Sequence, residues 1–271
     1  DIPAPVRMAT PLIRSFPDPG LVEKVADLLA RAQRPVLLIG GGANYSGAGD
    51  ALMRLAECLG APVVNSPTSR GVLPESNALV LGCAGIIGYE PVGNAIREAD
   101  LVLAIGSRLS DIQTSRGELL PAGAPIIQVD IDTAALGKEY PSEVGVVSDA
   151  KAFADALNEI LEANASPVSD ERRNWTESLS SRYTSWRDAW LTSTPDNGQV
   201  QPQEIVAALC EQPPETIYTH GAGDHGFYGF MAPIDPPGSH LVSTRLGAMG
   251  CALGLAMGAK WARPDQPVIT C

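Results

Sequence analysis

Short, mostly apolar runs alternate with amphipathic segments along the first 161 residues of the chain. Such runs, several of which stop at a glycine or an aspartate, are typical of strands buried on both faces of a parallel sheet. They predict strands at 35–39, 62–64, 101–105, 126–129 and 144–147. Apolar residues at helical spacing predict helices at 21–32, 47–59, 91–100 and 149–161. Because strands alternate with helices, we expect an α/β fold with a doubly wound parallel sheet.

The pattern changes after this region. Residues 162–200 are polar, with Trp175, Trp186 and Trp190 interspersed, which indicates an interdomain connection with a helical middle whose tryptophans pack onto a neighbouring domain. Beyond it we expect a second, incomplete α/β unit: a helix at 203–210, strands at 216–219, 241–243 and 267–270, a glycine-rich loop at 220–229, and a glycine-rich helix before the last strand. The predicted organisation is a linker (1–20), a central Rossmann-like domain (21–163), a connection (164–200) and a second domain (201–271).

The glycine-rich helix near the C-terminus carries no charge between Arg245 and Lys260. Gly250, Gly254 and Gly258 recur at every fourth residue, which places them on one helical face that another backbone or a flat ligand can approach closely. Small residues at this spacing also pack transmembrane helices. The apolar run is shorter than the roughly 20 residues that a membrane span needs. We therefore predict a helix buried on all sides within a soluble domain.

Composition narrows the classes of function. The 271 residues carry a net charge of −12 and no cluster of Lys or Arg, which disfavours nucleic acid and anionic membrane surfaces as partners. The five cysteines are scattered without CxxC pairs, which favours free thiols in a reducing compartment. With only three histidines, no zinc-site spacing occurs. No secretory signal opens the sequence, so we expect a cytoplasmic protein.

Two motifs of the central region could contact a ligand. Gly40–Gly42 follows a predicted strand, where glycines either let a phosphate approach a helix N-terminus or form a tight turn. The motif is not GxGxxG and no acidic residue stands about 20 residues further on, so the dinucleotide fingerprint fails. Asp130 and Asp132 end another strand, and a turn there is favoured over an acid–base pair. Their place at the carboxyl edge of the sheet keeps a ribose contact open.

Several segments resemble thiamine-diphosphate enzymes of the acetolactate synthase type. Residues 34–43 (RPVLLIGGGA), 99–108 (ADLVLAIGSR) and 127–132 (IQVDID) are similar to signature lines of that family's central domain. Residues 246–250 (LGAMG) and 258–265 (GAKWARPD) are similar to its diphosphate-binding domain. The resemblance implies thiamine diphosphate and Mg²⁺ as cofactors, with the metal ligands outside this chain, and a 2-oxo acid as substrate.

In this family the central domain binds FAD in the acetolactate synthase branch, and ADP or nothing in other branches. The resemblance places nucleotide contacts at Gly40, Gly41, Gly42, Arg108, Asp130, Asp149 and Ala150. That branch reads Gly-x-Arg-Phe-Asp-Asp-Arg, whereas Ile112 replaces the second arginine here, and its Met-His-Gly is Cys83-Ala84-Gly85. An empty or ADP-like site is therefore favoured over FAD.

The resemblance also implies a thiamine site in the second domain. Residues 221–226 (GAGDHG) are similar to the family's Asp-x-Gly-Gln/Asn-His segment, which meets the diphosphate. Gly223 and His225 match, although a structural histidine is the alternative for His225. Asp224 replaces an amide and would repel a diphosphate unless a cation intervenes. Met249 stands where a bulky apolar residue wedges between the two rings of the cofactor, and a core methionine is the alternative. The implied cofactor contacts are Gly223, Asp224, His225, Leu246, Gly247, Ala248 and Met249, with Met249 the catalytic one.

Three hypotheses follow. In the first, the chain is part of a thiamine-dependent transferase or lyase. The cofactor ylid of such an enzyme attacks a 2-oxo acid, CO₂ leaves, and the enamine is protonated or joined to a second carbonyl. The family's activating glutamate and its Gly-Asp-Gly metal motif have no counterpart in the sequence. We therefore expect the isolated chain to be inactive, and the active protein to be longer or completed by another polypeptide, as a homodimer or homotetramer. The second is another thiamine lyase, acting on a 2-oxo acid or an acyl-CoA. The third is a non-catalytic nucleotide-binding module that uses Gly40–Gly42.

Overall fold

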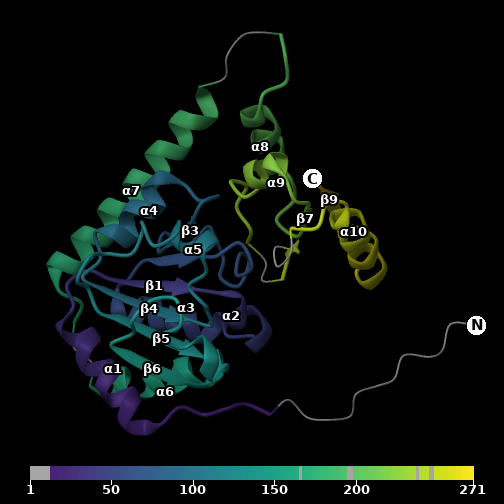
Figure 1. Cartoon of the computed structure of the whole chain (residues 1–271). Helices are drawn as coiled ribbons and strands as arrows, with labels where there is room; N and C mark the ends of the chain where they lie inside the picture. Colours follow the sequence, from purple (N-terminus) through teal and green to yellow (C-terminus); the bar gives the residue numbers. More distant parts are fainter. Residues whose placement is uncertain (1–12, 165–166, 194–197, 236–237, 244–246) are drawn as a thin grey trace, which may run out of the picture.

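The computed structural model describes residues 13–271 except 165–166, 194–197, 236–237 and 244–246. Two α/β units are joined by a long helix (Figure 1). The first unit holds a six-stranded parallel sheet in the order β3-β2-β1-β4-β5-β6. Its strands are β1 (Pro35–Ile39), β2 (Val63–Asn65), β3 (Val80–Cys83), β4 (Leu101–Ile105), β5 (Ile126–Asp130) and β6 (Val144–Val147). The predicted doubly wound α/β class is confirmed.

Helices cover both faces of this sheet, because its strands are apolar on both sides. They are α1 (Pro19–Arg31), α2 (Gly41–Ser46), α3 (Gly49–Leu59), α4 (Glu90–Arg97), α5 (Asp111–Thr114) and α6 (Ala150–Ala163), with a 3-10 turn η1 at Thr133–Ala135. Along β1, Leu37 and Ile39 face a core shared with α1, α3 and α6. Val36 and Leu38 face a second core shared with α4. The alternation of side chains along a strand thus divides one apolar run between two cores.

The connecting helix α7 (Asp170–Thr192) packs against both units. Trp175 lies against the second core of the central unit, and Trp186 contacts Tyr89 at 5.2 Å between ring centroids. Trp190 stacks on Tyr228 of the second unit at 6.0 Å. The tryptophans therefore pack onto neighbouring structure, as their position in a polar segment predicts.

The second unit is a three-stranded parallel sheet in the order β8-β7-β9. Its elements are α8 (Pro202–Cys210), β7 (Ile217–His220), α9 (Asp224–Gly229), β8 (His240–Val242), α10 (Cys251–Ala262) and β9 (Val268–Thr270). The segment expected to be a glycine-rich loop at 220–229 is a loop only as far as Gly223. There a φ of 142° ends the extended chain, and the Gly226 N–H donates to the Gly223 carbonyl and closes the first turn of α9.

The prediction that the glycine-rich helix is buried on all sides is wrong. Only Ala252 and Ala259 of α10 are buried. Leu253, Met257 and Trp261 are exposed, and a Cβ at Gly254 or Gly258 would meet no atom within 4 Å. The helix touches the small sheet along one narrow face, where the Thr219 hydroxyl donates to the Ala252 carbonyl at 3.1 Å. Its apolar composition therefore does not translate into burial. Within the described part of the chain, no helix combines the length and apolar character needed to cross a membrane.

Candidate functional site

The structure brings the residues proposed for a nucleotide to one edge of the central sheet. Gly40–Gly42 follows β1, Arg108 follows β4, Asp130 ends β5, and Asp149 follows β6. All six strands are parallel, so their carboxyl ends share this edge. The strand order reverses between β1 and β4, which is the position where open α/β sheets bind ligands.

The three glycines after β1 all face protein. A Cβ on Gly42 would lie 2.7 Å from the Gly106 Cα, one on Gly41 would lie 2.9 Å from the Thr68 Oγ1, and one on Gly40 would meet the Gly106 carbonyl oxygen. The turns after β1 and β4 are in contact here, since the Gly42 N–H donates to the Gly106 carbonyl at 3.0 Å. Gly106 has a φ of 61°, a conformation that favours glycine. Packing alone therefore accounts for the glycine motif as a tight turn.

Asp130 and Asp132 form a turn. The Asp132 N–H donates to the Asp130 carboxylate at 2.9 Å, and the Asp132 carboxylate accepts from the Ala134 N–H at 3.0 Å at the start of η1. Asp130 is buried. The Arg108 side chain, 60% exposed, lies 3.9 Å from the Asp132 carboxylate. Arg108 is therefore a cation at this edge that a ligand could reach.

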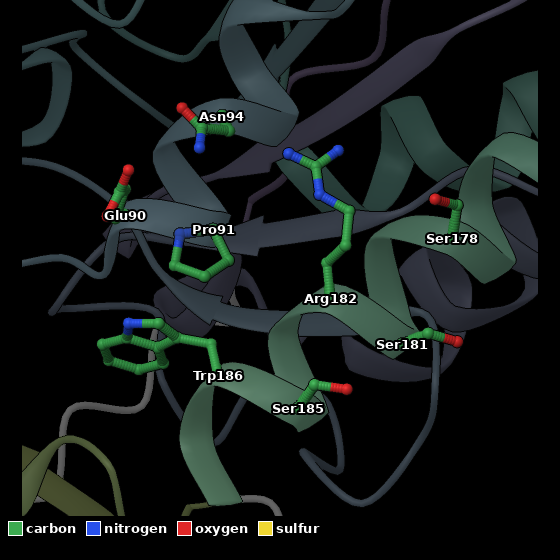
Figure 2. A pocket seen from close by; sticks show the side chains of 8 residues that line it. All are labelled: Glu90, Pro91, Asn94, Ser178, Ser181, Arg182, Ser185 and Trp186. Carbon is green, nitrogen blue, oxygen red and sulfur yellow. The ribbon is translucent and has the colours of Figure 1, made fainter. Parts of the chain in front are cut away.

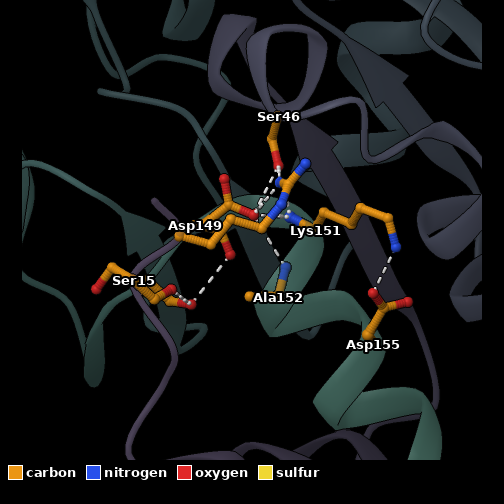
Figure 3. A network of polar contacts seen from close by, with 8 residues as sticks. Ser15, Ser46, Asp149, Lys151, Ala152 and Asp155 are labelled. Carbon is orange, nitrogen blue, oxygen red and sulfur yellow. Dashed lines mark hydrogen bonds and ion pairs between the residues drawn. The ribbon is translucent and has the colours of Figure 1, made fainter. Parts of the chain in front are cut away.

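The Asp149 carboxylate caps α6 (Figure 3). It accepts from the backbone N–H groups of Lys151 and Ala152, from the Ser46 hydroxyl at 2.8 Å and from Arg14 at 2.6 Å. Burial alone would raise the pKa of Asp149, but the hydrogen bonds from Ala152, Ser46 and Arg14 together lower it below its ordinary value. Ala150, the first residue of the helix, is buried. This carboxylate therefore stabilises the join between α2, α6 and the segment before α1.

In the second unit, the proposed thiamine contacts lie on two loops at the carboxyl edge of the small sheet. β7 and β8 are parallel, so the loops that follow them leave the same edge. Leu246 lies outside the described residues. For Asp224 and His225 the structure describes the backbone, which forms the first turn of α9.

Residues 247–250, which belong to the second of these loops, are exposed. Gly247 and Gly250 have positive φ values of 58° and 81°, and a Cβ at either would meet no atom within 4 Å. Ala248 is exposed, and Met249 is 84% exposed. The Gly221 N–H donates to the Cys271 carbonyl at 2.7 Å, so the end of β9 lies at the same edge. The open backbone at Gly247 and Gly250 and the exposed Met249 side chain therefore form a surface that a ligand could reach. Among the described residues, no group of three or more His, Cys, Asp or Glu is arranged to hold a metal ion.

A contact between the two units contains buried charged and titratable side chains that were not predicted from the sequence. The buried pair Arg70 and Glu75, from the loop between β2 and β3, contacts the segment after α9. Burial would lower the pKa of Arg70, but the Glu75 carboxylate raises it above its ordinary value. Burial, Arg70 and His220 together hold the pKa of His240 well below its ordinary value. The only signal in the sequence is a charged pair five residues apart whose four intervening residues, Gly-Val-Leu-Pro, are uncharged and mostly apolar.

A groove of about 490 Å³ lies between α4 and α7. Figure 2 shows its lining: Glu90, Pro91, Asn94, Ser178, Ser181, Arg182, Ser185 and Trp186. None of these residues was proposed from the sequence. Arg182, the only basic residue in the lining, donates to both carboxylate oxygens of Glu98 at 2.8 and 3.0 Å. Because its cation is already paired, the groove is poorly suited to a diphosphate.

Comparison with known protein families gives two separate matches along the chain. Residues 22–157 match the thiamine pyrophosphate (thiamine diphosphate) enzyme central domain. Residues 221–271 match the C-terminal thiamine pyrophosphate binding domain of such enzymes. The two matches lie on either side of α7.

Several relatives are similar over most of the chain. The acetolactate synthase large subunit of Parasynechococcus marenigrum is 33% identical over 258 residues, which cover 93% of this chain and 41% of the relative. A probable acetolactate synthase large subunit of Methanocaldococcus jannaschii is 32% identical over 277 residues, covering 99% and 46%. An acetolactate synthase of Mycobacterium leprae is 33% identical over 250 residues, covering 91% and 40%. The chain spans less than half the length of these curated relatives.

Proposed function

This chain belongs to the thiamine pyrophosphate enzyme family, and we propose that it is part of an acetolactate-synthase-like enzyme that decarboxylates a 2-oxo acid and joins the remaining fragment to a second carbonyl compound. The observation that carries the proposal is the order of two family domains in a chain whose relatives are named acetolactate synthase. In enzyme-class terms this is a transferase or lyase. Another thiamine-dependent lyase, acting on a 2-oxo acid or an acyl-CoA, is the alternative within the family.

Thiamine diphosphate, when bound, supplies the carbon nucleophile for this chemistry. The residues of this chain bind and orient it. A Cβ at Gly247 would meet no atom within 4 Å, so a diphosphate would be able to approach the backbone there, and the exposed Met249 side chain would provide an apolar contact for the rings. Asp224 needs a neighbouring cation such as Mg²⁺ if a diphosphate is to lie beside it, and we place the ligands of that cation outside this chain.

For the central domain we propose a scaffolding role, with an ADP-like ligand at Arg108 and Asp130 as the second candidate. The exposed guanidinium of Arg108, 3.9 Å from its nearest carboxylate, supports that candidate. FAD is disfavoured because Ile112, half-exposed on α5, replaces an arginine. An absorption spectrum of the purified protein tests this point, since a flavin band would contradict it.

We further propose that these 271 residues are inactive alone, and that a longer chain or a partner polypeptide, assembled as a homodimer or homotetramer, supplies the cofactor-activating glutamate and the metal site. Acetolactate formation from pyruvate should therefore require the full-length enzyme that contains this chain. Turnover by the 271-residue chain would contradict the proposal.

Met249 provides the sharper test. In the full-length enzyme, Met249→Ala should weaken thiamine diphosphate binding and lower kcat, because it removes the apolar support beside the open loop. Met257→Ala is the matched control, since Met257 is a similarly exposed methionine on α10. Equal effects of the two substitutions would contradict the assigned role. A protein that binds ADP but not thiamine diphosphate would instead favour the non-catalytic nucleotide-binding module.

A further inference from the structure

The loop between β2 and β3 reaches from the central unit into the second unit. Within this loop the Arg70 Nε donates to the Glu75 carboxylate at 2.9 Å, and the guanidinium also contacts the second carboxylate oxygen. The Arg70 side chain is 1% exposed. A buried ion pair has a large desolvation cost unless further hydrogen bonds satisfy its remaining atoms. The partners of the pair outside its own loop therefore show what it does.

Apart from the Asn65 side chain at the end of β2, which donates to the Glu75 carboxylate at 3.4 Å, those partners are backbone groups of the segment that follows α9. The Arg70 guanidinium donates to the Ala232 carbonyl at 2.7 Å. The Ile234 N–H donates to the Glu75 carboxylate at 3.2 Å, and the Glu75 N–H donates to the Ile234 carbonyl at 3.0 Å. The Ser76 N–H donates to the Asp235 carboxylate at 2.8 Å. Two of these bonds, to the Ala232 carbonyl and from the Ile234 N–H, are made by the charged groups of the pair, and hydrogen bonds to a charged group are the stronger kind.

Phe230, which lies between α9 and this segment, links Arg70 to the residue that precedes the proposed diphosphate loop. The Phe230 ring, at the C-cap of α9, lies against the Arg70 guanidinium, whose Cζ is 5.5 Å from the ring centroid. The same ring meets His220 edge-on at 5.4 Å, and His220 immediately precedes the loop at 221–223. A Cβ on Gly229, the last residue of α9, would collide with the His220 ring. Arg70, Phe230, α9 and the end of β7 therefore form a continuous chain of contacts.

We propose that Arg70, held by Glu75, is a positioning residue of the thiamine site. It ties α9 and the 221–223 loop to the central unit, so that the loop is preorganised for the diphosphate before the cofactor arrives. The inference rests on the proposed function, because it takes this loop as the diphosphate contact.

The test compares Arg70→Met, Arg70→Lys and Glu75→Gln in the full-length enzyme. Arg182→Met is the matched control, because it breaks a bidentate Arg–Glu pair that joins α7 to the central unit and does not touch α9. Arg70→Met should weaken thiamine diphosphate binding about tenfold or more, the loss expected for a charged hydrogen bond. The KM for the 2-oxo acid should change by less than about twofold, since the substrate is not contacted. Arg70→Lys should recover part of the affinity, and Arg182→Met should leave it unchanged.

A second readout does not depend on the cofactor. Hydrogen exchange of the α9 amides in the full-length enzyme without added thiamine diphosphate should accelerate about tenfold in Arg70→Met and remain unchanged in Arg182→Met. If Arg70→Met fails to fold, Arg70→Lys and Glu75→Gln provide both measurements.

The outcomes distinguish failure of the positioning role of Arg70 from failure of the proposed function. Wild-type affinity and exchange rates in folded Arg70 and Glu75 variants refute the positioning role. Failure of the unaltered full-length enzyme to bind thiamine diphosphate refutes the proposed function, and the positioning role at a thiamine site with it. Faster exchange in the variants would then show a tie between the two units and nothing more.

Discussion

Replacing Gly42 by alanine tests whether the glycine motif after β1 serves packing or a ligand. The added methyl group would lie 2.7 Å from the Gly106 Cα, whereas ordinary contacts of a Cβ begin near 3.4 Å. The turns after β1 and β4 must therefore separate by about 0.7 Å, the difference between these two distances. Both sides of the contact are backbone, so no side chain can rotate away.

The cost follows from three terms. Overpacking of this kind costs about 1–3 kcal/mol. Separating the turns also stretches the hydrogen bond between the Gly42 N–H and the Gly106 carbonyl, which contributes about 1 kcal/mol. Alanine recovers about 0.5–1 kcal/mol of helix propensity within α2. We expect a net loss of about 2 kcal/mol in the free energy of unfolding.

Gly254→Ala is the control, because it makes the same chemical change in the middle of α10, where a Cβ meets nothing within 4 Å. It should stabilise the protein by about 0.5–1 kcal/mol. Urea unfolding of the two variants without added nucleotide, followed by circular dichroism, measures both effects. If Gly42→Ala unfolds at the wild-type urea concentration and loses only nucleotide binding, the glycines serve a ligand and the packing explanation fails.

Three further predictions concern buried polar groups. Arg172→Met should lower the free energy of unfolding by about 3 kcal/mol, because the guanidinium donates to carbonyls at the ends of α1 and α3. The control is Arg173→Met at an exposed position, which should change the free energy of unfolding by less than about 0.5 kcal/mol. Asp149→Ala should cost about 1–2 kcal/mol through loss of the α6 cap. Because the folded pKa of Asp149 lies below its ordinary value of 3.8, this contribution is complete above that pH and is lost as the pH falls through the folded pKa, so the melting temperatures of wild type and variant should converge in acid. Burial raises the pKa of Cys83 to about 12, so a thiol reagent at pH 8 should label the exposed Cys210 in the folded protein and leave Cys83 unmodified until unfolding.

The strands of the central sheet were predictable because each carries its own signal. β1 and β4 begin and end at the predicted residues, since each is a five-residue apolar run between polar or glycine boundaries. β3 was hidden in the glycine-rich stretch at 77–88, because a four-residue strand that contains Gly82 has little periodicity. The extent of α7 was likewise not predictable, since its packing depends on a few aromatic residues in a polar segment.

The roles of the site residues were harder to predict than the fold. A glycine that lets a phosphate approach and a glycine that lets another turn approach look alike in a sequence. Only the position of Gly106 in the structure shows that Gly42 makes room for another turn. Local rules predict that an aspartate directly before a helix caps it, and Asp149 has this role in the structure. The assignment of Asp149 to a nucleotide contact came from the family resemblance alone. The exposure of Met249 depends on which surfaces face it, and composition does not encode that.

These assignments change what the central unit contributes. At its carboxyl edge the glycines are used in packing, Asp149 in a cap and Asp130 in a turn, so few groups remain there for a ligand. The same edge sends out the loop that carries Arg70, whose partner Ala232 lies 162 residues away in the sequence. No periodicity can reveal a contact at that separation, because patterns report only which neighbours share a face. We therefore infer that the central unit acts on the proposed thiamine site by holding α9 in place, and that the buried Arg70–Glu75 pair is the charged part of that contact.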